Sequence, residues 1–226
     1  MALLLNIETS TKNCSVGLSK DGVLVAYKEE NNGGYSHAEK LHVFIEELLK
    51  EKNLTITDLD GIAVGKGPGS YTGLRIGVST AKGLAYAGNI PLIAVDTLKV
   101  LAKSLHIDKE QLVVPMIDAR RLEVYTAIYN SNLEEILPVE AKIIDESSFH
   151  NELETCKVYF LGDGAHKCKE IILHENANFI DDKFPSVKEM AQLSEKKYQN
   201  KQFEDVAYFE PFYLKDFVVT PSKKKI

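Results

Sequence analysis

The stretch GKGPGSYTGLRIGVSTAKGLA, residues 65–85, constrains the fold more than any other part of the chain. It opens with three glycines and a proline within five residues, a composition that suits neither a regular helix nor a strand. Small residues then recur at every fourth position, as Gly73, Gly77, Ala81 and Ala85. Residues at this spacing share one face of a helix. The stretch therefore predicts a loop followed by a helix with one nearly bare edge.

The bare edge requires a packing reason, because a glycine inside a helix costs about 1 kcal/mol relative to alanine. It could lie against the backbone of its own lobe, or a second protein molecule could cover it. We expect the second arrangement. Gly73, Gly77, Ala81 and Ala85 would then meet the partner, with Arg75 beside them on the polar side of the helix.

The glycine loop also has two interpretations. It is either a tight strand-to-helix turn, or a phosphate-binding loop in which backbone amides at a helix N-terminus hold the anion. Its spacing matches neither the dinucleotide-binding glycine pattern nor the P-loop pattern. The turn is the simpler interpretation, and a nucleotide or phosphate contact stays open for Gly65, Gly67, Gly69 and Ser70.

An amphipathic helix is predicted upstream of the loop, beginning with a capping box formed by Ser36 and Glu39. His37 and Leu41 lie on its apolar side, and we assign both to the partner surface. His37 and His42 are five residues apart, which separates them by roughly 140° around the helix axis. They cannot chelate one ion, so we expect His37 to make a first-turn contact rather than to bind metal. This absence also counts against a metalloprotease.

An apolar strand, residues 3–7, ends at Glu8 and is followed by two further predicted strands. A similar order of strand, polar turn and strand returns at residues 113–129, where the first strand is followed by Asp118. The repetition predicts an α/β fold of two related lobes with mixed sheets. Asp118 could order a cation between the lobes or pair with a neighbouring arginine, Arg120 or Arg121, and we favour the pairing.

The polar segment after residue 104 suggests where the lobes divide. We expect residues 1–105 to form the N-terminal lobe, with the glycine loop and the partner helices. Residues 106–226 would form the C-terminal lobe and tail. The tail ends in Lys223, Lys224 and Lys225, which we interpret as a solvated basic segment.

Composition excludes several functions. The net charge is −6, which argues against strong independent binding of nucleic acid. Three cysteines without CxxC spacing offer no zinc site and fit a reducing compartment. No apolar run reaches the length of a membrane span, so we expect a cytoplasmic protein.

Four stretches, in order along the chain, resemble the TsaB (YeaZ) family. They are the glycine-rich stretch, LLLNIETSTKNCSVGL at the start, MIDARRLEVYTAIY in the centre and EPFYL near the end. The resemblance implies an actin-like ATPase (ribonuclease H-like) fold. It also implies a role in forming threonylcarbamoyladenosine beside the anticodon of tRNAs that read codons starting with A.

In that family the protein is a non-catalytic partner of the transferase TsaD and works with the small ATPase TsaE. The resemblance thus implies a heterodimer with TsaD, a homodimer in isolation, and contact with tRNA only through the complex. An ATP or ADP would belong to the complex interface. Many relatives have Asp where this chain has Glu8, so a metal-binding geometry is not carried over to Glu8.

The alternative is an autonomous ATP-dependent phosphotransferase of the sugar-kinase class. That chemistry needs phosphate loops from both lobes, a metal and a base. The chain offers only the glycine loop, Glu8 and Asp118 toward it. We therefore expect no enzymatic activity from the chain on its own.

Overall fold

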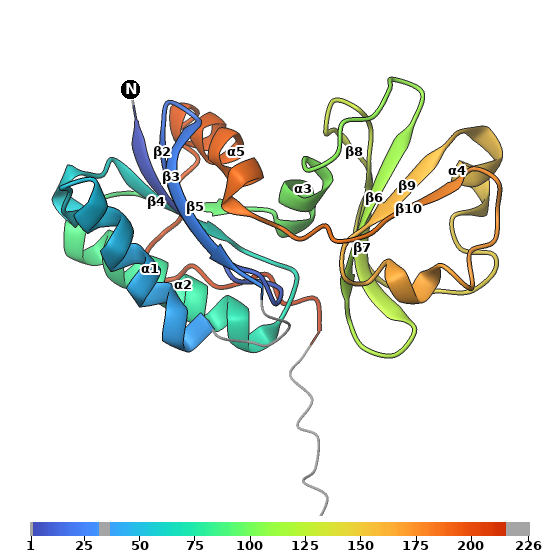
Figure 1. Cartoon of the computed structure of the whole chain (residues 1–226), viewed down its shortest axis with the longest axis horizontal. Helices are drawn as coiled ribbons and strands as arrows, with labels where there is room; N and C mark the ends of the chain where they lie inside the picture. The colour runs from blue at the N-terminus through green and yellow to red at the C-terminus, as the bar shows by residue number, and fades with distance from the viewer. Residues whose placement is uncertain (1, 32–36, 216–226) are drawn as a thin grey trace, which may run out of the picture.

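The computed structural model describes residues 2–31 and 37–215. Two β-sheets of five strands each form the centres of two lobes that lie side by side (Figure 1). The predicted capping box includes Ser36, which lies outside the described residues.

The first sheet has the strand order β3-β2-β1-β4-β5. Its first three strands are antiparallel, and the other two run parallel to β1. The strands are β1 (Leu3–Glu8), β2 (Cys14–Lys20), β3 (Val23–Glu30), β4 (Gly61–Gly65) and β5 (Leu92–Val95). The central β1 is almost wholly buried, as its apolar sequence predicts.

The second sheet repeats this plan in the order β8-β7-β6-β9-β10, with the same alternation of antiparallel and parallel pairs. Its strands are β6 (Leu112–Asp118), β7 (Glu123–Tyr129), β8 (Glu135–Ile143), β9 (Val158–Leu161) and β10 (Ala177–Ile180). The predicted α/β fold of two related lobes with mixed sheets is therefore confirmed.

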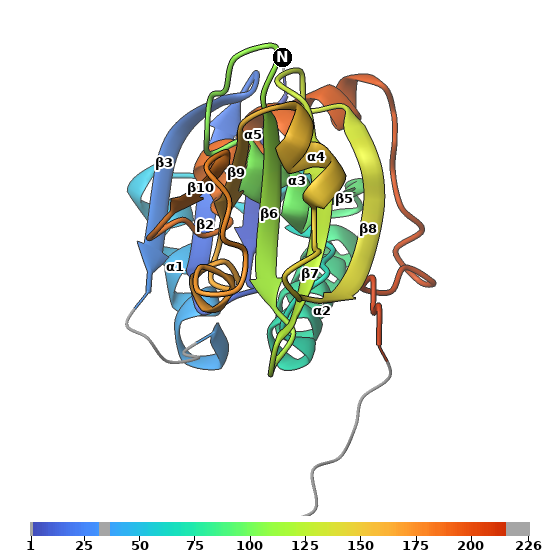
Figure 2. The same ribbon diagram turned by 90° about the vertical axis from the view of Figure 1, so that its right-hand side faces the viewer.

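Helices cover the first sheet on both faces, as Figures 1 and 2 show. α1 (His37–Glu51) and α2 (Tyr71–Gly88) lie side by side on one face, and α5 (Val187–Gln199) covers the other. The short helix α3 (Thr97–Ala102) lies between the lobes, and α4 (His150–Thr155) belongs to the second lobe. Two 3-10 turns, Ile56–Asp58 and His166–Cys168, complete the elements. In the described part of the chain, no helix has the length and apolar character needed to cross a membrane.

The chain returns to the first lobe after it has formed the second. α5 packs against β1, β2, β3 and β5, because that face of the first sheet carries apolar side chains that need cover. Met190 of α5 joins Leu4 and Ile93 in a buried cluster there. Farther on, the N–H of Phe212 donates to the carbonyl oxygen of Lys66 at 2.8 Å. The division at residue 105 separates the two sheets, but it assigned this returning segment to the second lobe.

Candidate functional site

The glycine loop connects β4 to α2, as the sequence predicts. Ser70 caps the helix, and its side-chain oxygen accepts the N–H of Gly73 at 3.3 Å. The helix ends at Asn89, whose backbone is left-handed with φ of 50°, a conformation that asparagine tolerates better than most residues. The order strand, glycine turn and capped helix thus follows from local sequence.

The bare edge of α2 is covered by the turn that follows β1. The hydroxyl of Thr9 donates to the carbonyl oxygen of Gly73 at 2.8 Å. A β-carbon on Gly73 would lie 2.1 Å from the carbonyl oxygen of Thr9, and one on Gly77 would lie 2.2 Å from the Thr9 hydroxyl oxygen. A side chain at Gly73 would displace the backbone of the turn, and one at Gly77 would displace the Thr9 side chain, so contacts inside the lobe account for both glycines.

Ala81 and Ala85 continue the same edge into the main core of the first lobe, where both are almost fully buried. The stripe of Gly73, Gly77, Ala81 and Ala85 is therefore covered by its own lobe, not left open for a partner as we expected from the sequence. The four-residue spacing identified the face correctly, but it could not tell which backbone would lie on that face.

Two other predicted partner residues are also internal. His37 is 2 % exposed, and its Nε2 donates to the carbonyl oxygen of Thr11 at 2.7 Å. Burial lowers the pKa of His37, which favours the neutral ring. Leu41 is fully buried in the core. His37 thus joins the first turn of α1 to the β1–β2 turn: it makes the expected first-turn contact, but inside the lobe.

Arg75 is the exception among the seven predicted partner residues, since its side chain reaches the surface. Its guanidinium lies over the ring of Tyr71 at 5.3 Å, and Nη1 donates to the Tyr71 hydroxyl oxygen at 3.2 Å. Tyr71 in turn packs against the ring of Tyr213, with ring centroids 4.9 Å apart.

Three backbone amides of the glycine loop are occupied by internal hydrogen bonds. The N–H of Lys66 donates to Val95, that of Gly67 to the Thr97 hydroxyl, and that of Ser70 to the carbonyl oxygen of Ser10. A β-carbon on Gly69 would lie 2.4 Å from that same Ser10 oxygen. These contacts favour the interpretation as a tight turn. The three N–H groups are not available to a phosphate.

Glu8 lies at the end of β1, where the fold would place an acid facing the space between the lobes. It is instead fully buried, and its Oε1 accepts the Ser10 N–H at 2.7 Å. A β-carbon on Gly65 would lie 2.2 Å from its Oε2. Burial raises the pKa of Glu8, while hydrogen bonds from Ser10, Thr9 and Thr97 oppose the shift. The carboxyl is a packed group beneath the glycine loop.

Asp118 has the equivalent place at the end of β6, but it is exposed. Its carboxylate pairs with Lys167 and also accepts the backbone N–H of Arg120 at 3.0 Å. The favoured pairing with an arginine side chain is therefore replaced by a pairing with Lys167, which comes from a different turn of the second lobe.

Other chemistry is sparse. Within residues 2–31 and 37–215, no group of three or more His, Cys, Asp or Glu side chains could hold a metal ion. The three cysteines form no disulfide. Two open hollows of about 470 and 550 Å³ are lined by β8 with α4, and by residues 108–111 with 155–157. Both lie away from the glycine loop.

The sequence did not indicate the long-range contacts of Thr9 and Thr97, whose hydroxyl groups join the β1–β2 turn to α2 and Glu8 to the glycine loop. Thr9 lies within the polar run after the first strand, which is the one signal that could have indicated it. Its partner is 64 residues away, so no local pattern shows the contact.

The repeated sheet topology defines the class: this is a two-lobed α/β protein with the actin-like ATPase fold. In the first lobe, the turn after β1 packs directly against α2.

Comparison with known proteins narrows the class. The family model described as "TsaD: tRNA N6-adenosine threonylcarbamoyltransferase" matches residues 32–222. The chain is 28 % identical over 225 residues to the protein named tRNA threonylcarbamoyladenosine biosynthesis protein TsaB in Haemophilus influenzae, which covers 95 % of this chain and 94 % of that relative. It is 34 % identical over 177 residues to the TsaB of Bacillus subtilis, which covers 75 % and 74 %.

The structure of YeaZ from Pseudomonas aeruginosa matches 95 % of this chain and all of its own, with a TM-score of 0.78 at 26 % identity. The chain belongs to the TsaB (YeaZ) family. These relatives favour the tRNA-modification interpretation over an autonomous phosphotransferase.

Proposed function

We propose that this chain takes part in forming threonylcarbamoyladenosine in tRNA as the non-catalytic partner of a TsaD transferase. Two of the similar proteins are named for the biosynthesis of this nucleoside, and the matching family model is named for the transferase. In this proposal TsaD carries the transfer to the tRNA. The chain holds the lobes of TsaD in a competent arrangement and helps to recruit TsaE.

The turn between β1 and β2, residues 9–13, is covered by α2 and the glycine loop, and we call it the closed turn. It is the observation that supports a non-catalytic role. Phosphoryl-transfer sites depend on free amides, a metal ion and charged groups that face the substrate. Here the amides of Lys66, Gly67 and Ser70 are bonded internally, and Glu8 is packed against Gly65. A nucleotide that meets this chain would do so at the interface with TsaD, where ATP or ADP is our proposal. We also propose a cytoplasmic location.

We place the partner surface on the outer side of α1 and α2, opposite the bare edge. This outer helix face consists of the exposed residues His42, Val43, Thr72, Arg75, Ser79, Gly83 and Tyr86. Tyr86 is 82 % exposed and adds a large aromatic side chain to this face.

Gly83 supports this placement most directly. It lies within α2, yet nothing is within 4 Å of the position that its β-carbon would occupy. Contacts inside the lobe therefore do not require it, in contrast to Gly73 and Gly77. A second backbone that approaches the outer helix face would give it a purpose. When TsaD is absent, a second copy of the chain could use the same face in a symmetric pair.

A bulky charge at Gly83 tests the surface without disturbing the monomer. We expect Gly83→Arg to remain folded, because the site is open, and to lose co-elution with TsaD in size-exclusion chromatography. Gln192→Arg serves as the control, because it adds the same charge at an exposed position of α5. Unchanged co-elution of Gly83→Arg would show that the partner binds elsewhere.

A reconstituted modification reaction tests the function itself. Unmodified tRNA, ATP, threonine, bicarbonate, TsaD, TsaE and the enzyme that makes the threonylcarbamoyl-adenylate are incubated with and without this chain. Mass spectrometry of the digested tRNA then measures threonylcarbamoyladenosine. We expect product only when the chain is present. Equal yields without it would contradict the proposed function.

A further inference from the structure

The hairpin between β6 and β7 holds two consecutive arginines in an unfavourable backbone conformation. Arg120 has φ of 72° and Arg121 has φ of 52°, a region that favours glycine and asparagine. Both side chains are exposed. Neither guanidinium makes a hydrogen bond or ion pair with the residues that the structure describes. The fold thus keeps two unneutralised cations at a hairpin tip at some conformational expense.

Other basic side chains surround this tip. Lys167 pairs with Asp118 and also donates to the carbonyl oxygen of Glu123 at 2.6 Å. Lys215 pairs with the carboxylate of Glu123 and comes from the segment that returns along the first lobe. Together with Lys12 these residues form what we call the basic rim: Lys12, Arg120, Arg121, Lys167 and Lys215.

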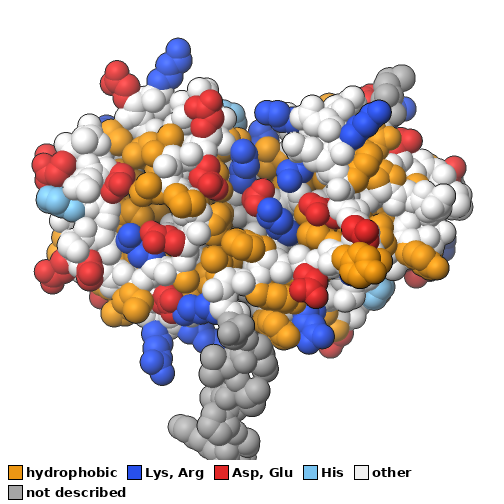
Figure 3. Space-filling view, turned by 180° about the vertical axis from the view of Figure 1, so that it is seen from behind, with side chains coloured by type: hydrophobic (Ala, Val, Ile, Leu, Met, Phe, Trp, Pro, Cys, Tyr) orange, Lys and Arg blue, Asp and Glu red, His pale blue; other side chains and the backbone are white. Residues whose placement is uncertain are grey.

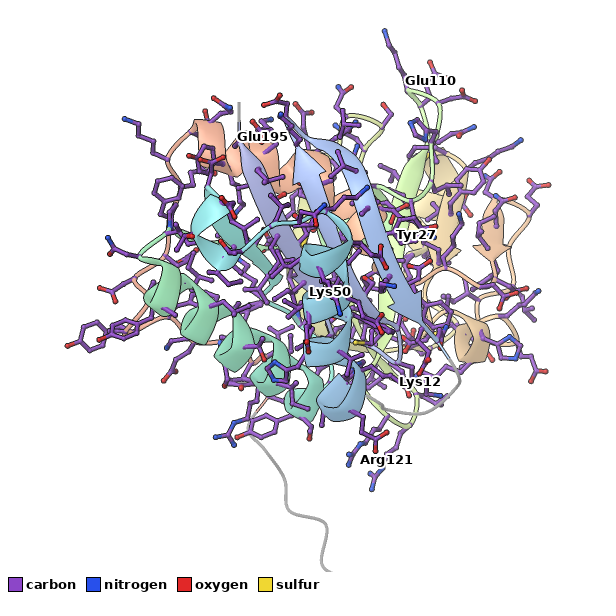
Figure 4. All side chains as sticks on the ribbon, turned by 60° about the vertical axis from the view of Figure 1, so that its left-hand side comes forward. Lys12, Tyr27, Lys50, Glu110, Arg121 and Glu195 are labelled. Carbon is purple, nitrogen blue, oxygen red and sulfur yellow. The ribbon has the colours of Figure 1, made fainter. Side chains whose placement is uncertain are left out.

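Lys12 is the residue of the basic rim that comes from the β1–β2 turn of the first lobe. It is exposed in the β1–β2 turn, and its charge acts on Asp163 of the second lobe. Burial raises the pKa of Asp163, and the charges of Lys12 and Lys167 oppose that shift. Figure 4 shows Lys12 and Arg121 at the same end of the molecule, opposite Glu110 and Glu195.

The charges of the rim do not cancel. Asp118 and Glu123 are each paired with a lysine, and Asp163 is the third carboxyl beside the rim, so three acids face five cations. Within the described residues, no acid forms an ion pair with Lys12, Arg120 or Arg121. The chain as a whole carries a net charge of −6, and basic and acidic side chains are interspersed on the rear face (Figure 3). The rim therefore has the opposite sign of charge to the chain as a whole.

We propose that the basic rim contacts the phosphate backbone of the tRNA when the chain is assembled with TsaD. This inference rests on the proposed function and adds a binding surface to it. Guanidinium groups match the geometry of phosphate oxygens, and contacts of this kind position an RNA without reading its bases. A few contacts on an acidic protein give little affinity alone, so binding requires the complex.

The shape of the rim favours a polyanionic chain over an acidic protein partner. Lys12 and the two arginines lie on hairpin turns of different lobes, Lys167 lies in a 3-10 turn and Lys215 on the returning segment, so the cations are spread along a surface, as contacts to a phosphate backbone are. The arginines are held by the hairpin backbone and remain solvated, as phosphate contacts in RNA complexes commonly are.

Substitutions that relieve the backbone strain test the rim without harming the fold. The double variant Arg120→Asn with Arg121→Gly removes both charges, and each new residue suits a positive φ. Its complex with TsaD is titrated against fluorescently labelled unmodified tRNA at several salt concentrations. We expect the affinity to fall about tenfold, and the slope of log affinity against log salt to decrease by about two. The melting temperature should not fall.

Lys201→Asn is the matched control. Lys201 is exposed, also has a positive φ of 54°, and follows α5 at the end of the helix away from the rim. The change removes a charge and relieves strain in the same way, so we expect tRNA affinity and salt slope to stay at wild-type values.

The outcomes separate this inference from the proposed function. Wild-type affinity and slope for the double variant, in a complex that forms normally, would overturn the inference alone. Loss of TsaE recruitment with unchanged tRNA affinity would assign the rim to an acidic protein and would also overturn it. Failure of the wild-type chain to join TsaD would refute the proposed function, and the inference with it.

Discussion

The turns after β1 and after β6 occupy the same place in the two lobes, yet one is buried and the other exposed. After β1, Glu8 and Thr9 are fully covered by the glycine loop and α2. After β6, Asp118 and Arg120 lie at the surface. With the same strand order, the turn is therefore part of the packed interior in the first lobe and exposes charged side chains in the second.

The difference arises from the segment that comes after the neighbouring parallel strand. In the first lobe β4 leads into α2, an 18-residue helix that lies over the turn. In the second lobe β9 leads into Gly162, which packs tightly on β6: its β-carbon would lie 2.2 Å from the carbonyl oxygen of Met116. Only a 3-residue 3-10 turn comes next, so the hairpin tip beyond Asp118 stays uncovered.

The substitution with the largest expected effect on stability is one that disrupts the contact between the closed turn and α2. Gly73→Ala places a β-carbon 2.1 Å from the carbonyl oxygen of Thr9, which belongs to rigid backbone. We expect a loss of about 3 kcal/mol in the free energy of unfolding, measured by urea denaturation. A loss below about 1 kcal/mol would show that the turn is not held against α2.

A smaller effect comes from the buried carboxyl of Glu8, whose pKa is raised by burial above its ordinary value of 4.5. The folded state then favours the protonated form. Stability of the wild type should fall as pH rises from about 4.5 through the raised pKa, because ionisation in the fold is opposed. Glu8→Gln cannot ionise, so its stability relative to wild type should increase over that interval. Denaturation midpoints across a pH series measure this; parallel curves for the two proteins would contradict it.

Gly83→Ala compares the outer face of α2 with the face that packs against the closed turn. Its site is open, whereas that of Gly73 is filled. The substitution should raise the free energy of unfolding by about 1 kcal/mol, since alanine favours helix over glycine. Thermal melting provides the measurement. A loss of stability here would mean that contacts within the lobe do constrain this face.

Asp118→Asn should have the smallest effect. Its side chain is 47 % exposed, and exposed ion pairs such as that with Lys167 contribute little. Asparagine can still accept the N–H of Arg120. We expect a change of less than about 1 kcal/mol by urea denaturation. A much larger loss would place the second turn in the same structural role as the first.

Local pattern was enough to predict much of this fold. Periodicity located the opening strands of both lobes, the amphipathic α1 and the loop before α2, because these depend on neighbouring residues. The cover of the glycine stripe was not predictable in the same way, since the contact between Thr9 and Gly73 spans 64 residues. The return of α5 to the first sheet depends on an apolar face that only the assembled sheet reveals.

The candidate site was predicted less completely. Spacing excluded a metal site at His37 and His42, but it could not show that His37 bonds to Thr11 inside the lobe. The acids Glu8 and Asp118 were correctly placed at equivalent turns. Whether each is buried or exposed depends on the segment that follows the neighbouring parallel strand, which the turn sequence does not encode.

Titration of the isolated chain with ATP and magnesium in a calorimeter tests the closed turn most directly. Because the amides of Lys66, Gly67 and Ser70 are bonded internally and Glu8 is packed against Gly65, we expect no binding at micromolar nucleotide and no release of phosphate. Micromolar binding accompanied by turnover would contradict the closed first lobe and the non-catalytic role that depends on it.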